Sequence, residues 1–294
     1  MKALVTGGAG FVGSNLTDTL IERGDEVVII DNISTGKREN LNPKAVHHEK
    51  DLRNYEEIAP IFKGIDCVFH IAALPRVQIS IENPVESHDN NINATFNVLL
   101  AAKEAGVKRV VYSASSSAYG DQTVMPLNET ALPSPMSPYG LQKFVGEGYC
   151  KVFALVYNIE TVSLRYFNVY GQRMADEGAY CTVISVFLRQ KAEGKPMTIT
   201  GDGGQTRDFT HISDVVQANI LASESPNVGK GEVINIGAGN NASVNKIAEL
   251  IGGETVNIPP RLEPRDTLAD NKLAKQLIGW EPKVKLEDGI KRLL

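Results

Sequence analysis

Short apolar runs alternate with longer amphipathic stretches along the first half of the chain. The runs are rich in Val, Ile and Leu, as in strands buried on both faces. Between them, apolar residues recur at the three- and four-residue spacing of a helix face. The pattern predicts strands at 2–6, 26–30, 45–49, 67–71, 109–113 and 160–165, and helices near 12–23, 54–63, 86–106 and 138–157. This alternation indicates a parallel sheet covered by helices on both faces, with a ligand crevice at the carboxyl ends of its strands.

The pattern loosens after residue 166. It predicts helices near 180–193, 212–223 and 243–251, a strand at 232–236, and short helices after Asp270 and Leu286. We therefore expect an α/β protein with a Rossmann-type doubly wound parallel sheet over 1–166. A smaller C-terminal substrate-binding domain is expected over 167–294, with segments near 210–236 returning to the first domain.

Composition excludes several function classes. The 294 residues are 42% hydrophobic and 22% charged, which suits a globular chain with an ample core. The net charge of −5 offers no basic surface for nucleic acid, and no apolar run reaches membrane-spanning length. Met1 leads directly into the first strand, so no signal peptide is expected. Three widely spaced cysteines suggest reduced thiols, no metal site and a cytoplasmic location.

A glycine-rich turn joins the first predicted strand to the first predicted helix. Gly7, Gly10 and Gly13 suit a tight turn, a close approach of the backbone to a ligand, and close packing of helix on strand. The helix N-terminus favours a phosphate group. Asp31 ends the next strand, where its carboxylate would accept the hydroxyls of an adenine ribose and repel a 2′-phosphate. This arrangement predicts a dinucleotide site that prefers NAD to NADP.

Tyr139 and Lys143 form the second chemical signal. They are four residues apart on a predicted helix, after Ser137 and Pro138, which suit its N-cap and first position. A phenol with a pKa of ~10 needs roughly 4 kcal/mol of stabilisation of its anion to act as a base near neutral pH. A nearby ammonium and the positive helix end would contribute to it. Such a pair also arises by chance, so its place after the fifth strand carries the argument.

Hydroxyl residues follow the fifth predicted strand. Ser115, Ser116 and Ser117 stand where side chains would reach a substrate oxygen and the phenol of Tyr139. A serine-rich turn without function is the alternative reading of this run.

Together these motifs resemble the extended short-chain dehydrogenase/reductase family, in its NAD-dependent epimerase/dehydratase group. The likeness is greatest to the UDP-glucose (UDP-galactose) and UDP-N-acetylglucosamine 4-epimerases. The segments that carry it span nearly the whole chain: 6–13, 31–36, 70–73, 91–95, 115–117, 139–143, 165–171 and 201–209.

The resemblance implies roles for matching residues. Tyr139 would be the base for the sugar 4-hydroxyl, Lys143 would hold the nicotinamide ribose and acidify the phenol, and Ser115 would be the third catalytic residue. The implied NAD contacts are Gly7, Gly10, Phe11, Val12, Gly13, Asp31, Asn32, Ser34, Gly36, Asp51, Leu52, Ala72, Ala73, Asn91, Ser113, Tyr139, Lys143 and Tyr166. The implied contacts to a UDP-sugar are Ser115, Ser116, Ser117, Tyr139, Asn168, Arg207, Arg261, Arg265 and Thr267.

Two points of that set stay open. An arginine of this part of the chain would help to hold the diphosphate. The segment that begins at Arg261 is shorter than in similar proteins, so the matching residue is either Arg261 or Arg265. Thr267 would wall the hexose pocket, and its small side chain would leave room for an N-acetyl group. The resemblance also implies a homodimer formed by helices 86–106 and 138–157, for which Val98, Leu99, Phe144 and Val145 supply apolar side chains.

The residues after Ser115 bear on the reaction. In similar sugar 4,6-dehydratases an acidic pair follows the catalytic hydroxyl, whereas Ser116 and Ser117 have no carboxyl group. We therefore expect a 4-epimerase of UDP-hexoses that works through a 4-keto intermediate. Another nucleotide-sugar enzyme, such as a 4,6-dehydratase or a uronic-acid epimerase, is the alternative, followed by a non-catalytic NAD-binding sensor.

Overall fold

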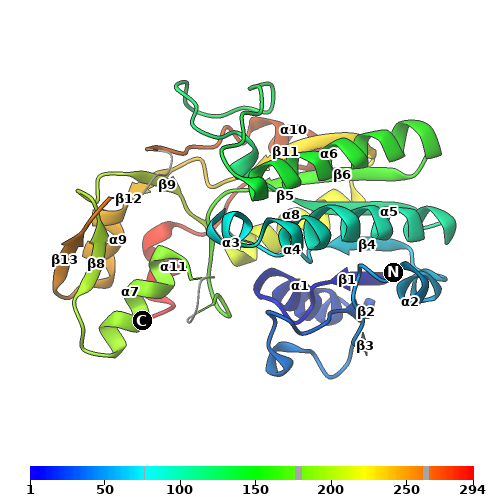
Figure 1. Cartoon of the computed structure of the whole chain (residues 1–294), viewed down its shortest axis with the longest axis horizontal. Coiled ribbons are helices and arrows are strands. Elements are labelled where there is room, and N and C mark those ends of the chain that lie inside the picture. Colours follow the sequence, from blue (N-terminus) through cyan, green and yellow to red (C-terminus); the bar gives the residue numbers. More distant parts are fainter. Residues whose placement is uncertain (76, 176–180, 261–264) are drawn as a thin grey trace.

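The structure, a computed structural model, describes residues 1–75, 77–175, 181–260 and 265–294. Its centre is a seven-stranded parallel sheet in the order β11-β6-β5-β4-β1-β2-β3 (Figure 1). The strands are β1 Lys2–Thr6, β2 Glu26–Ile30, β3 Val46–His48, β4 Cys67–His70, β5 Arg109–Ser115, β6 Glu160–Tyr166 and β11 Lys230–Ile236. The predicted doubly wound α/β fold is confirmed, and its strand order reverses between β1 and β4.

Helices cover both faces of this sheet. The α-helices of the described residues are α1 Phe11–Glu22, α2 Tyr55–Ile58, α3 Val77–Glu82, α4 Pro84–His88, α5 Ala94–Glu104, α6 Pro138–Tyr157, α7 Val183–Ala192, α8 Ile212–Glu224, α9 Val244–Ile251, α10 Lys272–Ile278 and α11 Leu286–Lys291. Apolar side chains of α1 and α8 pack into one core, and those of α5 and α6 into the core on the opposite face. Both faces of each central strand are therefore buried beneath helices, which explains why the strand sequences are almost entirely apolar.

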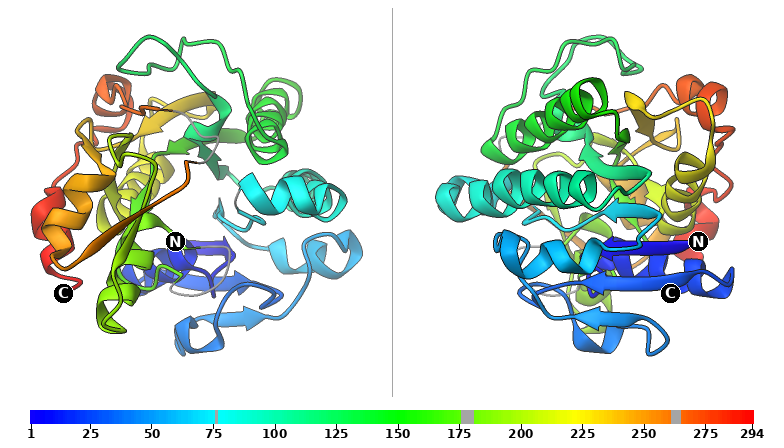
Figure 2. Two further views of the ribbon diagram at one scale, coloured as in Figure 1. Left: turned by 60° about the vertical axis from the view of Figure 1, so that its left-hand side comes forward. Right: turned by 90° about the vertical axis from the view of Figure 1, so that its right-hand side faces the viewer.

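Smaller elements of the second half form a separate core. The two-stranded pairs are β7 Val169–Tyr170 with β10 Thr210–His211, β9 Thr206–Asp208 with β12 Asn241–Ser243, and β8 Met197–Thr200 with β13 Thr255–Ile258. Phe187 of α7 and Ile247 of α9 are fully buried in this core. The β8–β13 pair lies to the left of the large sheet in Figure 1, on the side that the left view of Figure 2 brings forward. Division of the chain into two domains at residue 166 stays a prediction, since β11 and α8 come from the second half yet belong to the large sheet.

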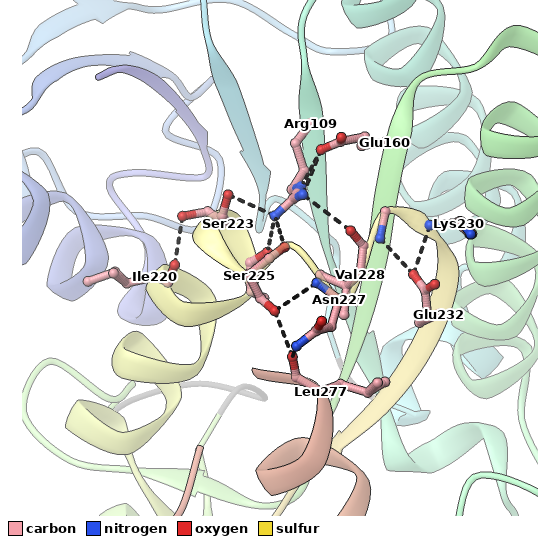
Figure 3. Close-up of polar contacts among 12 residues, drawn as sticks. Arg109, Glu160, Ile220, Ser223, Ser225, Asn227, Val228, Lys230, Glu232 and Leu277 are labelled. Carbon is pink, nitrogen blue, oxygen red and sulfur yellow. Dashed lines mark hydrogen bonds and ion pairs between the residues drawn. The ribbon is translucent and has the colours of Figure 1, made fainter. Parts of the chain in front are cut away.

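Arg109 holds the returning segment in place at the amino end of β5. Its guanidinium is almost fully buried and donates to the carbonyl oxygens of Ala222, Ser223, Ser225 and Val228 at 2.8–3.2 Å (Figure 3). It also bonds Glu160 at 2.8 Å. The carbonyls of Ala222 and Ser223 belong to the last turn of α8, where a helix has no internal partners for them, and those of Ser225 and Val228 follow the helix. A cation at this end also suits the helix dipole.

Three predicted helices differ from those observed. Residues 54–63 form α2 and then the 3₁₀ helix η2 (Ala59–Phe62), in which a proline replaces a backbone donor. Residues 86–106 are divided by a π-helical turn, η3 (Asp89–Asn93), between α4 and α5. The third helix, expected at 180–193, begins at Val183, because Thr182 is its N-cap.

Two of the four side chains predicted for a dimer contact face inward. Val98 and Leu99 of α5 are buried in the core beneath the sheet, so this part of the prediction is wrong. Apolar side chains that are exposed on α5 and α6 include Phe96, Phe144 and Leu155. A dimer through these helices stays a prediction.

Candidate functional site

One large cavity opens at the carboxyl ends of the parallel strands. Its volume is about 1250 Å³, and it reaches from the glycine turn after β1 to the smaller elements around Arg207. Sites for ligands lie at this edge of doubly wound sheets, next to the point where the strand order reverses. Most of the predicted site residues line it: Gly7, Gly10, Phe11, Val12, Gly13, Asp31, Asn32, Ser34, Gly36, Asp51, Leu52, Ala72, Ala73, Ser113, Ser115, Ser116, Ser117, Tyr139, Lys143, Tyr166, Asn168, Arg207 and Thr267.

The glycine turn brings the N-terminus of α1 to the cavity wall. Gly7 has a φ of +75°, and a Cβ at Gly13 would lie 2.1 Å from the carbonyl oxygen of Gly7. Only glycine at position 13 therefore lets α1 pack this closely on the turn. The N-cap of α1, Gly10, makes no side-chain capping bond. The first turn of α1 consequently presents backbone amides where an anionic group would be stabilised.

Asp31 stands beside this turn at the end of β2. Its carboxylate is buried and accepts from the backbone amides of Ala9 at 2.9 Å and Ile33 at 2.8 Å. Both oxygens keep lone pairs for further donors. Asp51 lines the same end of the cavity, and a two-bond contact with Arg53 lowers the pKa of that carboxyl to about 2. This end of the cavity therefore suits a ligand with hydroxyl donors and repels an additional phosphate.

Helix α6 places Tyr139 and Lys143 in the wall of the cavity. The helix begins as predicted: Ser137 is its N-cap, its hydroxyl accepts from the amide of Gly140, and Pro138 follows. The Lys143 ammonium is buried and donates to the carbonyl oxygen of Ser113 at 2.7 Å. Burial lowers the pKa of Lys143 to about 7, because the charged form loses its hydration.

A second set of buried charges lies one helical turn beyond Lys143. Glu147 of α6 forms a two-bond ion pair with Arg165 of β6, at 2.8 and 2.7 Å, with each side chain only 3% exposed. The Arg165 guanidinium also stacks on the ring of Tyr119. This pair was not predicted from the sequence, although the four-residue spacing of Lys143 and Glu147 places Glu147 on the same side of α6.

Two predicted contacts, Asn91 and Arg265, are not among the residues that line the cavity. The amide group of Asn91 is buried and bonds both backbone polar groups of Leu74, at 2.8 and 3.0 Å. The Arg265 guanidinium is exposed and pairs with Asp202 at 3.1 Å. Arg261 lies outside the described residues. Contacts of these three residues with a ligand stay predictions.

The end of the cavity opposite the glycine turn has cationic and amide groups. Asn168 and Arg207 line it, and Arg207 donates to the carbonyl oxygens of Thr206 at 2.8 Å and Arg265 at 3.2 Å. Thr267 stands in the wall with its hydroxyl 3.4 Å from the amide of Asp208. An arginine and an amide at one end suit a diphosphate, which accepts several charge-assisted hydrogen bonds.

No group of three or more potential metal ligands occurs in the part of the chain that the structure describes. Among the same residues, no helix has both the length and the apolar character needed to cross a membrane.

Comparison with known proteins places this geometry in a family. Residues 3–237 match the model of the NAD dependent epimerase/dehydratase family. The chain belongs to this family. A UDP-glucose 4-epimerase from Thermotoga maritima, solved with UDP-glucose, is 40% identical with a TM-score of 0.95 over 99% of this chain and 96% of that one.

Other similar structures carry different names. A UDP-N-acetylglucosamine 4-epimerase from Methanobrevibacter ruminantium, in complex with UDP-N-acetylmuramic acid, is 35% identical with a TM-score of 0.93 over 99% of this chain and 97% of that one. A UDP-glucuronic acid 4-epimerase from Bacillus cereus, with UDP-glucuronic acid and NAD, is 35% identical with a TM-score of 0.90 over the full length of both. The family predicted from the sequence is confirmed, and its members differ in the sugar.

Proposed function

We propose that this protein is an NAD-dependent 4-epimerase of UDP-hexoses. The observation that carries the proposal is the meeting of Ser115, Tyr139 and Lys143 in one cavity with the glycine turn at one end and Arg207 at the other. The cavity exceeds the ~300–1,000 Å³ of a typical small-ligand pocket, which supports two ligands lying end to end.

The residues present fit NAD. The first turn of α1 would bind the pyrophosphate, Asp31 the adenine-ribose hydroxyls, and Lys143 the nicotinamide ribose. When bound, NAD supplies a reversible acceptor for the hydrogen at C4 of the sugar.

The side chains would perform the proton chemistry. Tyr139 as phenolate takes the proton of the 4-hydroxyl and later returns it to the 4-keto oxygen. The ammonium form of Lys143 favours that phenolate, and Ser115 bonds the same sugar oxygen. Arg207 and Asn168 hold the diphosphate, so the hexose turns about this anchor and presents its other face.

The sugar specificity is proposed from the wall of the cavity. Thr267 is small, so we propose that N-acetylated UDP-hexoses are accepted beside plain ones. A 4,6-dehydratase would also need a carboxyl group next to the reacting carbons, and Ser116 and Ser117, which stand after Ser115 in the cavity wall, have none.

The test is incubation with UDP-glucose, UDP-N-acetylglucosamine and UDP-glucuronic acid, followed by NMR of the products. We expect the 4-epimers of the first two. Loss of water would identify a dehydratase, turnover of the uronic acid alone a uronic-acid epimerase, and binding of NAD without turnover a sensor.

The Tyr139→Phe variant checks the proposed base. Loss of a general base costs ~10²–10⁴ in rate, so kcat should fall by that factor while NAD binding is kept. Tyr149→Phe on the same helix is the matched control, because Tyr149 packs on Phe96 away from the cavity. Near-normal turnover by Tyr139→Phe would remove the phenol from the mechanism.

A further inference from the structure

Helix α3 has one side at the cavity and the other side against α6. Val77 and Ile81 line the cavity and are 43% and 53% exposed, so a ligand seated there would cover their apolar surface. Ser80, between them, is fully buried on the side of α6. The same short helix therefore contacts both the ligand space and the helix that carries Tyr139.

The hydroxyl of Ser80 makes two hydrogen bonds. It donates to the carbonyl oxygen of Val77 at 2.6 Å and accepts from the backbone amide of Tyr139 at 3.0 Å. That amide belongs to the first turn of α6, where amides have no partner within the helix. Ser137 caps the next amide, that of Gly140. A side chain from α3 thus completes the N-terminus of α6 at the residue that bears the phenol.

A second attachment holds α6 one turn later. The Gln142 side-chain oxygen accepts from the Ser87 hydroxyl at 2.8 Å and from the Asn91 amide at 2.7 Å. This contact involves a side chain of α6, whereas the contact of Ser80 involves the Tyr139 backbone itself. The hydroxyl groups of Ser80 and Ser87, which both bond α6, can therefore be removed one at a time and compared.

We propose that Ser80 is a positioning residue for Tyr139, and that its hydrogen bond couples the seating of a dinucleotide against α3 to the placement of the phenol. Ligand contact with Val77 and Ile81 orders α3, and the bond from Ser80 transmits this order to the start of α6. The catalytic consequence rests on the proposed epimerase function. A misplacement of about 1 Å at a reacting group costs ~100-fold in rate, so even a small release of α6 is measurable.

The kinetic test is a double-mutant cycle. Ser80→Ala should lower kcat by about 10- to 100-fold and change the KM for UDP-glucose by less than about threefold. Ser87→Ala, the control, should change kcat by less than about threefold. If Ser80 acts through the phenol, Ser80→Ala should cause no further loss in a Tyr139→Phe background. Equal losses from Ser80→Ala in both backgrounds would overturn the proposal.

The second test needs no sugar. Amide hydrogen exchange is measured with and without NAD on the segments 77–83 and 139–143. In the native protein NAD should slow exchange in both segments, and in Ser80→Ala only in the first. Slowing of both segments in the variant would refute the coupling. A native protein without epimerase activity, in which the exchange coupling is nevertheless present, would reject the proposed function alone.

Two further variants keep the proposal testable where Ser80→Ala does not fold. Ser80→Cys keeps the shape of the side chain with a somewhat larger sulfur atom, and replaces the hydroxyl with a weak donor and acceptor, so it should repeat both results in a folded protein. Ser80→Thr keeps a hydroxyl that reaches the carbonyl three residues before it, and it should restore kcat. Activity of Ser80→Cys equal to that of the native protein would overturn the proposal.

Discussion

Acid should destabilise this protein through His70, the last residue of β4, which is buried between β1 and α5. The Thr6 hydroxyl oxygen accepts from the backbone amides of Ile71 and Ala72, each at 3.1 Å. Its single proton is therefore left for His70 Nδ1 at 2.8 Å. Since Ala72 lines the cavity, this contact also supports the wall of the proposed site.

The other ring nitrogen of His70 has an equally definite partner. The Thr95 hydroxyl donates to the carbonyl oxygen of Asn91 at 2.7 Å, so it accepts from His70 Nε2 at 2.9 Å. The neutral ring with its proton on Nε2 satisfies both contacts. A proton added to Nδ1 would face the hydroxyl proton of Thr6. Burial, together with the nearby Lys143 charge, lowers the pKa of His70 to about 3.

The direction of the pH effect follows from this lowered pKa. The ordinary value is 6.5, so between pH 6.5 and 3 the unfolded chain binds a proton that the folded chain does not. The contribution of the neutral His70 ring to the free energy of unfolding is fully present above pH 6.5 and is lost as the pH falls toward 3. At pH 5, proton uptake by the unfolded chain lowers the free energy of unfolding by about 2 kcal/mol.

Urea unfolding at pH 7.5 and pH 5 measures this loss. His70→Asn should be less stable than the native protein at pH 7.5, yet should lose about 2 kcal/mol less free energy of unfolding between the two pH values. His88→Asn, at an exposed position of α4, is the matched control and should keep the native loss. Equal losses in the native protein and His70→Asn, or an imidazole NMR signal of His70 that titrates near pH 6, would refute the reasoning.

Three further outcomes are expected. Asp31→Ala should narrow the preference for NAD over NADP by about tenfold or more, since one charge-assisted contact is lost. Equal affinities of the native protein for NAD and NADP, measured by titration, would reject the role of Asp31. Arg109→Met should lower the free energy of unfolding by at least ~2 kcal/mol, because buried carbonyls lose their donor, with kcat unchanged; a lower kcat in the folded variant would contradict this. Leu155→Arg should dissociate the predicted dimer in light scattering, whereas Leu132→Arg, at an equally exposed loop position, should not; a monomeric native protein would remove the dimer.

Local sequence order was enough for the strand, glycine turn and helix around Gly7, and for the start of α6 at Ser137. In both cases the spacing of a few neighbouring residues determines backbone conformation and capping. The same local logic brought Tyr139 and Lys143 to one side of a helix. Asp31 and Ser115 stand at the carboxyl ends of two predicted strands. Since the carboxyl ends of parallel strands lie at one edge of the sheet, the sequence also predicted that these two residues share that edge.

Tertiary structure decided what depends on partners distant in the chain. The sequence left Arg261 and Arg265 as alternatives, and only the folded chain shows Arg265 paired with Asp202. Val98 had the same apolar character as an interface residue but packs under the sheet.

The contacts of Ser80 and His70 were likewise invisible in the sequence. Ser80 reaches an amide 59 residues away, and His70 a hydroxyl 64 residues away. A periodic pattern reports whether a side chain is buried, but burial alone does not say which polar group is brought opposite it. That is decided by how the helices and strands pack, and each buried polar group then needs the partner that the packing provides.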